Sequence, residues 1–336
     1  MEQLVARWAH NPKVVSSSLA PATKSKRLRK VPQPFFILGP HILLPMHKSG
    51  FVNIIGNPNV GKSTLMNAFI GEDLSITTPK AQTTRHRILG LLNNDEYQIV
   101  FSDTPGIIQP GYALQEHMMD FVQSTFEDAD VFLFLTEPSE KPLKDERFLR
   151  KLKDTEVPVL LIINKIDLTE QKELERVVEH WQQVLPNAEI YPVSALNNFN
   201  TDVLLQRILE LLPEGPSYFS KEELSDKDER FFVSEMVREA ILKNYQKEIP
   251  YAVQVEVEEF KEEENIIRIR STIYVERDTQ KSIIIGHQGK MIKRTGTDAR
   301  KRMEAFFKKK IFLDLFVKVR KNWRQNEDQL RRFGYR

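Results

Sequence analysis

Short apolar runs alternate with amphipathic stretches through the first half of the chain. Continuous apolar runs of three to five residues that end at polar or turn residues are typical of strands covered on both faces of a parallel sheet. The predicted strands cover residues 51–55, 99–101, 131–135 and 159–163, and the predicted helices cover 63–70, 145–153, 170–184 and 202–212. The alternation predicts a doubly wound α/β domain with its ligands at the carboxyl ends of the strands.

The pattern changes after residue 213, where the chain reads Pro-Glu-Gly-Pro and an acidic segment follows. Proline and glycine at such spacing mark a boundary. We expect an α/β domain at 49–213, a linker at 214–230 and a smaller domain at 231–336. The second domain has the pattern helix, strand, strand, helix, helix, strand, which predicts a compact α+β fold.

Residues 1–48 show no sustained periodicity and contain six prolines. Three interpretations stay open: a disordered leader, an organellar transit peptide, or upstream sequence preceding initiation at Met46. We favour the third slightly, which would make residues 1–45 spurious. Under the second, the protein would be organellar.

Composition narrows the class of protein. The chain has 40% hydrophobic residues and no apolar run long enough to span a bilayer. It has no cysteine, which excludes thiol chemistry and disulfides. Its net charge of +2 is unevenly distributed: residues 1–48 carry eight Lys/Arg against one acid, and residues 286–336 carry sixteen against five. A basic end on an acidic body indicates a polyanion bound by one part of the molecule.

The segment 56–63, Gly-Asn-Pro-Asn-Val-Gly-Lys-Ser, has the pattern of a phosphate-binding loop between a strand and a helix. Glycines let backbone amides converge on phosphate oxygens, Lys62 reaches the β- and γ-phosphates, and Ser63 is a Mg²⁺ ligand. The predicted nucleotide-binding residues here are Gly56, Asn57, Pro58, Asn59, Val60, Gly61, Lys62, Ser63 and Thr64.

Two further segments predict a sensor for the γ-phosphate. Asp103-Thr104-Pro105-Gly106 follows a strand, where the aspartate can hold Mg²⁺ through water and the Gly106 amide can contact the γ-phosphate. The loop 80–87, Lys-Ala-Gln-Thr-Thr-Arg-His-Arg, offers a mobile threonine for the metal. We choose Thr84 before Thr83.

The base is specified by residues 164–167, Asn-Lys-Ile-Asp, after the strand 159–163. The Asp167 carboxylate can accept two hydrogen bonds from guanine that adenine cannot supply. Asn164 and Lys165 brace the loop, and the segment with Ser194 and Ala195 can offer a backbone amide to the guanine oxygen. Together the phosphate loop, residues 103–106, residues 164–167 and the segment with Ser194 and Ala195 predict a domain that binds GTP and GDP and disfavour an adenylate kinase.

These motifs together resemble the Era family of ribosome-assembly GTPases. Residues 283–296, with Gly286-His287-Gln288-Gly289 at their centre, resemble the GxxG segment of the family's type II KH domain. The resemblance covers about 49–336. It implies slow GTP hydrolysis, Mg²⁺ as cofactor, and binding to the 3′ end of 16S rRNA during assembly of the 30S subunit. It also implies a cytoplasmic monomer with peripheral contact to the inner face of the membrane.

The resemblance also assigns roles within each domain. Asn59 matches an asparagine that holds K⁺ against the phosphates in related GTPases, and it joins Lys62, Thr84 and Gly106 as a catalytic residue. Ile107 stands where other GTPases carry a water-orienting glutamine, so its side chain cannot polarise water. For RNA, the GxxG glycines permit close approach of the backbone. The predicted RNA-binding residues are Gly286, His287, Gln288, Gly289, Lys290, Lys293 and Arg294.

Two other functions fit parts of the pattern. A related tRNA-modification GTPase would share the phosphate loop and switch but lack a KH segment. A constitutive RNA-binding protein would use the nucleotide only for structure, which intact Lys62, Thr84 and Asp103 disfavour.

Overall fold

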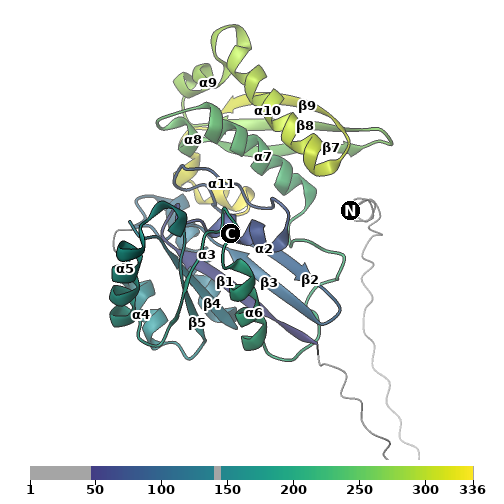
Figure 1. The fold of residues 1–336 in the computed structure, drawn as a ribbon. Coiled ribbons are helices and arrows are strands. Elements are labelled where there is room, and N and C mark those ends of the chain that lie inside the picture. The colour runs from purple at the N-terminus through teal and green to yellow at the C-terminus, as the bar shows by residue number, and fades with distance from the viewer. Residues whose placement is uncertain (1–46, 140–144, 336) are drawn as a thin grey trace, which may run out of the picture. The chain divides into compact units, whose positions relative to one another are not determined.

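The computed structural model describes residues 47–139 and 145–335. The leader predicted at 1–48 lies outside the described residues except for its last two positions. The described residues build a six-stranded sheet followed by a three-stranded one (Figure 1). The strands of the first sheet are β1 (Lys48–Gly56), β2 (Ile88–Asn93), β3 (Tyr97–Asp103), β4 (Val131–Thr136), β5 (Val159–Ile163) and β6 (Glu189–Pro192).

The first sheet has the order β2-β3-β1-β4-β5-β6. Strands β3, β1, β4, β5 and β6 run parallel, and β2 is antiparallel to β3. The central strands are buried throughout, as their unbroken apolar runs predict. This order places the carboxyl ends of β1, β3 and β5 at one edge, where a doubly wound fold binds its ligand.

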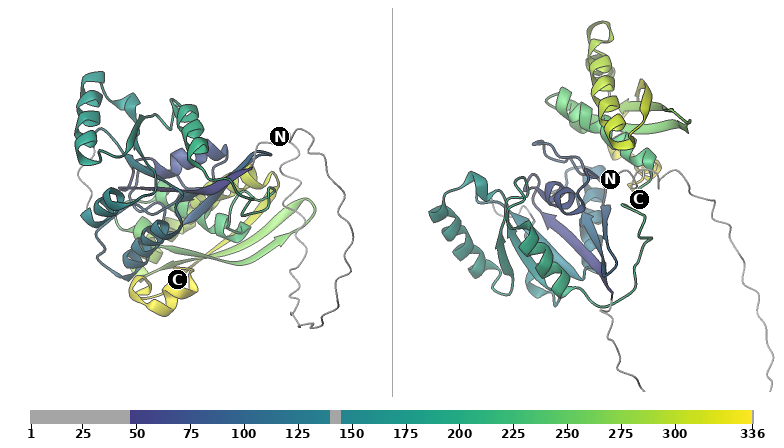
Figure 2. Two further views of the ribbon diagram at one scale, coloured as in Figure 1. Left: turned by 90° about the horizontal axis from the view of Figure 1, so that it is seen from below. Right: turned by 45° about the vertical axis from the view of Figure 1, so that its right-hand side comes forward.

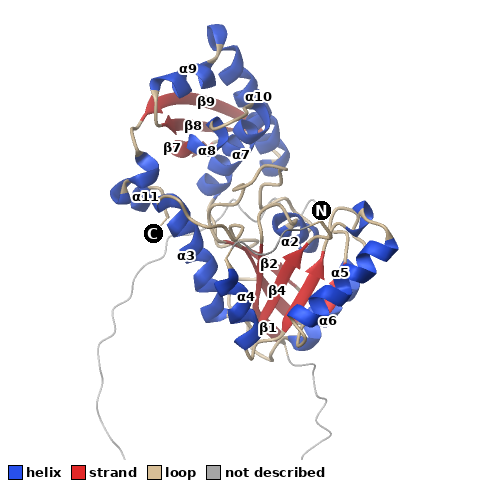
Figure 3. Cartoon of the chain, turned by 90° about the vertical axis from the view of Figure 1, so that its left-hand side faces the viewer, coloured by secondary structure: helices blue, strands red, loops and turns tan. Residues whose placement is uncertain are grey.

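Helices cover both faces of this sheet (Figure 3). On one face, Phe126 and Trp181 pack against Phe132 and Phe134 of β4. On the other face, Phe69 stacks on Phe101 with ring centroids 4.9 Å apart. The helices are α2 (Lys62–Ile70), α3 (Ala113–Asp128), α4 (Glu146–Asp154), η1 (Ile166–Leu168), α5 (Gln171–Val184) and α6 (Thr201–Leu211).

The predicted linker at 214–230 is hydrogen-bonded to the first sheet. The Ser225 hydroxyl donates to Leu89 O at 2.6 Å. The Gln98 side chain accepts from the amides of Tyr218 and Phe219. The segment therefore follows the β2–β3 edge before helix α7 begins at Glu229.

The second sheet has the order β7-β8-β9, with β7 antiparallel and β9 parallel to β8. Helix α7 packs on α10 (Figure 2). The rings of Phe232 and Phe306, one from each helix, lie 5.4 Å apart. Trp323 is fully buried and donates to Ala252 O at 3.0 Å, so it is a packing residue. The elements are α7 (Glu229–Asn244), α8 (Ile249–Ala252), β7 (Gln254–Glu262), β8 (Ile266–Val275), α9 (Asp278–Ile285), η2 (His287–Gly289), α10 (Lys290–Phe307), β9 (Lys310–Val319), η3 (Trp323–Gln325) and α11 (Glu327–Arg332).

Across residues 47–139 and 145–335, no helix combines the length and apolar character needed to cross a bilayer.

Candidate functional site

The phosphate loop connects β1 to α2, as the sequence predicts. Gly61 adopts φ 99° at the helix start, and a Cβ built there would lie 2.2 Å from the Asn164 amide nitrogen. Glycine is therefore required for both conformation and close approach. The Lys62 ammonium is buried and donates to Gly56 O and Asn57 O, at 3.1 and 2.8 Å. The loop therefore holds the Lys62 ammonium against its own backbone carbonyls.

Three oxygen-bearing side chains converge beside this loop. The Ser63 hydroxyl donates to Asp103 Oδ2 at 2.7 Å and lies 3.0 Å from the Thr84 hydroxyl. The Thr84 hydroxyl donates to the same carboxylate oxygen at 3.3 Å. The Thr83 hydroxyl instead donates to Lys80 O at 2.6 Å. The geometry therefore supports Thr84 over Thr83 as the switch threonine.

This group suits a hard cation such as Mg²⁺, which prefers oxygen ligands and retains waters. Asp103 Oδ1 is buried without a hydrogen-bond partner. Burial raises the pKa of the Asp103 carboxyl, while the Ser63 hydroxyl and the Lys62 ammonium oppose that shift. A nearby cation would favour the charged carboxylate. The set of Ser63, Thr84 and Asp103 has a single carboxylate, and the described residues contain no cluster of three or more His, Cys, Asp or Glu that could hold a metal.

The Asp103–Gly106 loop touches the phosphate loop directly. A Cβ built on Gly106 would lie 2.6 Å from the Pro58 Cα, and the Ile107 amide donates to Gly56 O at 3.0 Å. The Ile107 side chain is fully buried in the core. The Thr104 hydroxyl donates to Ile54 O at 2.7 Å and anchors the loop to β1.

The base-recognition segments meet at the ends of β5 and β6. The Ser194 hydroxyl donates to Asp167 Oδ1 at 2.5 Å. Asn164 donates from its side chain to Val60 O at 2.8 Å, which ties this region to the phosphate loop. Its Oδ1 accepts the Ala195 amide at 2.9 Å. Of the two amides in this segment, that of Ala195 is engaged by Asn164 and that of Ser194 donates to Phe199 O at 3.2 Å, and an amide contact with the base stays a prediction.

A cavity of about 600 Å³ joins these parts. It contains Lys62, Ser63, Thr84 and Gly106 from the predicted set and Lys165 near the base-recognition end. Sequence reasoning missed several residues that line this cavity. In the sequence, only their position next to the motifs indicates that they belong to the site. They are Ile76, Thr77, Thr78, Pro79, Gln82 and Leu196.

The GxxG loop joins α9 to α10, and its two glycines differ. Gly286 has φ 71°, and a Cβ there would lie 2.6 Å from the Met291 side chain. Gly289 has φ 73° with nothing within 4 Å of a built Cβ. His287 and Gln288 between them are exposed. Gly286 therefore serves packing, whereas Gly289 leaves open space for a ligand.

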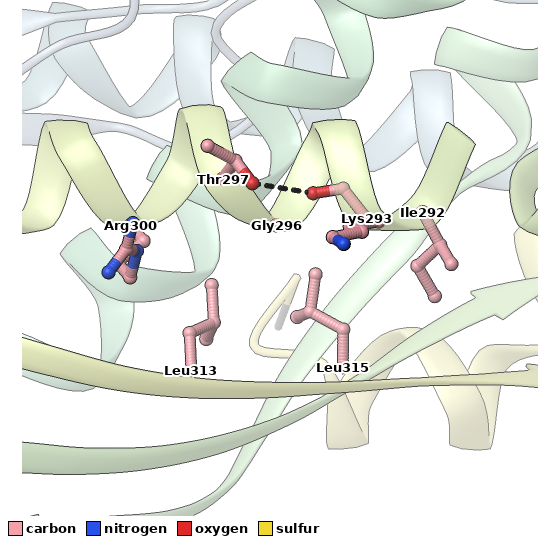
Figure 4. Close-up of a pocket in the computed structure, with 7 residues that line it drawn as sticks. All are labelled: Ile292, Lys293, Gly296, Thr297, Arg300, Leu313 and Leu315. Carbon is pink, nitrogen blue, oxygen red and sulfur yellow. Dashed lines mark hydrogen bonds between the residues drawn. The ribbon is translucent and has the colours of Figure 1, made fainter. Parts of the chain in front are cut away.

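A groove of about 310 Å³ lies between α10 and β9 (Figure 4). Lys293 is the one predicted RNA-binding residue in its lining. Sequence reasoning missed Leu313 and Leu315, although the two alternate on one strand face. The remaining lining residues are Ile292, Gly296, Thr297 and Arg300.

The fold and the two sites define a P-loop GTPase joined to a KH domain. Residues 51–165 match the family model described as 50S ribosome-binding GTPase, and residues 248–324 match the KH domain model. GTPase Era of Thermoanaerobacter sp. (strain X514) is 42% identical over 292 residues, covering 86% of this chain and 97% of the relative. GTPase Era of Geotalea daltonii is 46% identical over 289 residues, covering 85% and 97%.

One solved structure is that of Era in complex with MgGDPNP and nucleotides 1506–1542 of 16S ribosomal RNA. It matches with a TM-score of 0.82 and 37% identity, covering 86% of this chain and 99% of that chain. The chain belongs to the Era family of GTPases. The predicted fold class and family resemblance are thereby confirmed, and the KH match argues against the tRNA-modification alternative.

Proposed function

We propose that this protein is a GTP-switched RNA-binding factor that binds the 3′ end of 16S rRNA and assists assembly of the 30S subunit. The observation that carries the proposal is the presence, in one chain, of a triphosphate pocket with an aspartate at the base position and a GxxG groove. The relative solved with MgGDPNP and 16S rRNA supports both ligands. The family resemblance adds a cytoplasmic monomer with peripheral contact to the inner membrane face.

On the nucleotide side, each residue of the pocket has a distinct role. Lys62 leaves the carbonyls of its own loop to contact the β- and γ-phosphates. Ser63 and Thr84 would hold Mg²⁺ directly and Asp103 through water, and the bound ion would supply positive charge against phosphate oxygens. The Gly106 amide faces the γ-phosphate, and the Asp167 carboxylate accepts from guanine.

Hydrolysis is expected to be slow, because no polar side chain follows Gly106 to orient water. Ile107 is buried in the core, away from the cavity. Asn59 is the candidate for a K⁺ site: it adopts φ 70° and donates from its side chain to Pro79 O at 3.0 Å. In this position its side chain lies at the rim of the phosphate loop, where K⁺ would complete the positive charge around the phosphates.

On the RNA side, a single RNA strand lies along the groove between α10 and β9. Its backbone passes Gly289, and Lys290, Lys293 and Arg294 contact its phosphates. Leu313 and Leu315 form the apolar wall against which bases pack.

The test is RNA binding in two nucleotide states. Fluorescence anisotropy with an oligonucleotide from the 16S 3′ end measures the affinity of the full chain loaded with GDP or with a non-hydrolysable GTP analogue. The proposal predicts tighter RNA binding with the analogue, and tighter analogue binding with RNA by the same factor. An oligonucleotide of reversed sequence is the control. Equal RNA affinity in both states would contradict the switch, and equal affinity for both oligonucleotides would contradict the target.

A further inference from the structure

Residues 80–87, which we call the switch loop, line the nucleotide cavity and also contact residues far along the chain. The Lys80 ammonium donates to Leu242 O and Tyr245 O at the end of α7. The Arg85 guanidinium donates from Nη1 to Val253 O at 2.7 Å. In the opposite direction, the Arg238 guanidinium of α7 donates to Thr83 O. The loop and the KH domain therefore hold each other's backbone.

Arg85 is the most enclosed of these cations, with 1% of its surface exposed. Its Nη2 donates to Pro250 O and Tyr251 O, both at 3.2 Å, so three backbone carbonyls at the end of α8 accept from Arg85, and the Tyr335 side chain is a further hydrogen-bond partner. Burial lowers the pKa of its guanidinium. A buried cation is tolerated only when hydrogen-bonded, and helix-terminal carbonyls carry partial negative charge. The position of the Arg85 side chain therefore depends on where these carbonyls lie.

The geometry connects this contact to the metal ligands. Thr84 immediately precedes Arg85, and its hydroxyl reaches Ser63 and Asp103 at 3.0 and 3.3 Å. Thr83 before it is held through its carbonyl by Arg238. Thr84 thus lies between two residues fixed to the KH domain. Displacement of α7 or α8 would carry Thr84 away from the other two ligands.

Helix α7, which also contacts α8, leads to the RNA groove. Helix α7 packs on α10 through Phe232 and Phe306, and α10 lines one wall of the groove. The Tyr245 hydroxyl, just after α7, donates to Ile284 O at 2.8 Å on α9 and receives the Thr295 hydroxyl of α10 at 3.0 Å. The elements that hold the switch loop therefore also hold both helices flanking the GxxG loop.

We propose that Arg85 is the positioning residue that couples RNA binding to the nucleotide site. Seated on the carbonyls of α8, Arg85 places Thr84 where the γ-phosphate state requires it, and a closed switch loop in turn fixes α8 and α7, of which α7 packs on the α10 wall of the groove. The inference rests on the proposed function and identifies the contact through which RNA and GTP raise each other's affinity.

The test compares Arg85→Gln with the wild-type full chain. Affinities for a fluorescent GTP analogue and for GDP are measured with and without the 16S 3′ oligonucleotide, alongside the thermal unfolding midpoint. Thr84 is proposed to contact the metal only when a γ-phosphate is bound. In Arg85→Gln, affinity for the GTP analogue should therefore fall about tenfold, and affinity for GDP should change less than about twofold. The enhancement by RNA should fall towards one.

Two further variants keep the test decisive if Arg85→Gln folds poorly. Arg85→Lys keeps the charge but lacks the planar fork that spans three carbonyls, and is expected to be intermediate. Lys80→Met removes a less buried contact to α7 and should cause a smaller loss of the same kind. Arg87→Gln is the matched control, since Arg87 donates to Ser102, Asn53 and Asp128 near the first sheet. It should lower the unfolding midpoint and leave the coupling intact.

The outcomes separate the two proposals. If the wild-type chain shows no coupling between RNA and nucleotide, the proposed function fails and this inference fails with it. If the wild type shows coupling that is undiminished in Arg85→Gln, or undiminished in both Arg85→Lys and Lys80→Met when Arg85→Gln is unfolded, the inference alone is overturned. Equal losses of GDP and analogue affinity would indicate a purely structural arginine and would also overturn it.

Discussion

Thr83 and Thr84 are neighbours of identical chemistry whose hydroxyls contact different parts of the molecule. The Thr84 hydroxyl joins Ser63 and Asp103, whereas the Thr83 hydroxyl lies 2.8 Å from that of Thr78. The sequence placed the switch threonine in this loop, but spacing alone could not show which of the two faces the metal ligands. The structure distinguishes them, and the adjacent Arg85 contacts residues more than 160 positions away along the chain.

Asp167→Asn tests guanine recognition at a single atom. The substituted amide presents a donor where guanine also presents donors, so guanine affinity should fall at least about a hundredfold and xanthosine nucleotides should gain. Competition binding with GDP and XDP measures the change. Asp154→Asn, at the exposed end of α4, is the control and should leave the preference unaltered. Unchanged guanine selectivity in Asp167→Asn would refute the role of this carboxylate.

His86 gives the stability of the protein a pH dependence. Its ring stacks on Tyr335 with centroids 4.3 Å apart. Desolvation, assisted by Arg238, Lys227 and Arg85 and opposed by Glu235, lowers its pKa from 6.5 to about 4. Between these values the unfolded chain binds a proton that the folded chain does not. The free energy of unfolding therefore falls as the pH drops from 6.5 to 4, by at most about 3 kcal/mol.

The check is urea denaturation of the wild type and His86→Phe across this pH range. Phenylalanine keeps the ring contacts but cannot titrate, so the variant should lose stability less steeply on acidification. His180→Phe, on the exposed side of α5, is the control and should follow the wild type. Identical slopes for His86→Phe and the wild type would show that this residue does not carry the effect.

At the scale of elements, continuous apolar runs were predictable from the sequence, whereas an edge strand and a one-turn helix were not. Residues 159–163 were predicted as a strand and form β5, because their burial on both faces leaves a continuous apolar pattern. Strand β2 was missed: it lies at the sheet edge, and its interior Gly90 interrupts the apolar signal while packing on α2. Helix α8 has only four residues, too few to show a period, yet its carbonyls hold Arg85.

The GxxG loop illustrates how one motif combines two requirements. Gly289→Ala introduces a side chain at φ 73° without a steric clash, which should reduce the free energy of unfolding by about 1–2 kcal/mol. Gly71→Ala, at φ 78° and equally open, is a matched control with the same expected loss. RNA affinity should fall about tenfold in Gly289→Ala alone, since only that Cβ enters the path of the RNA backbone.

Anisotropy with the 16S 3′ oligonucleotide and thermal unfolding of the two glycine variants provide the measurements. Equal RNA affinity in both variants would show that the backbone does not approach Gly289.

At the scale of the whole molecule, the charge segregation seen in the sequence overstates the charge available to RNA. Residues 286–336 carry sixteen Lys/Arg against five acids. Several of these cations are paired with acids elsewhere, such as Arg302 with Asp73 and Arg324 with Glu276. Within the part of the chain that the structure describes, Lys290, Lys293 and Arg294 form no salt bridge. The sequence could not make this distinction, because the pairing partners are distant along the chain.

The salt dependence of RNA binding should therefore reflect a few unpaired cations rather than the net charge. Each phosphate neutralised on a single strand contributes about −0.7 to the slope of log K against log salt. Lys293→Gln should make the slope shallower by about that amount. Lys318→Gln, whose ammonium is paired with Glu258 at 2.9 Å, should leave the slope unchanged. Equal slopes in Lys293→Gln and the wild type would remove Lys293 from the phosphate contacts and locate the electrostatic attraction outside the groove.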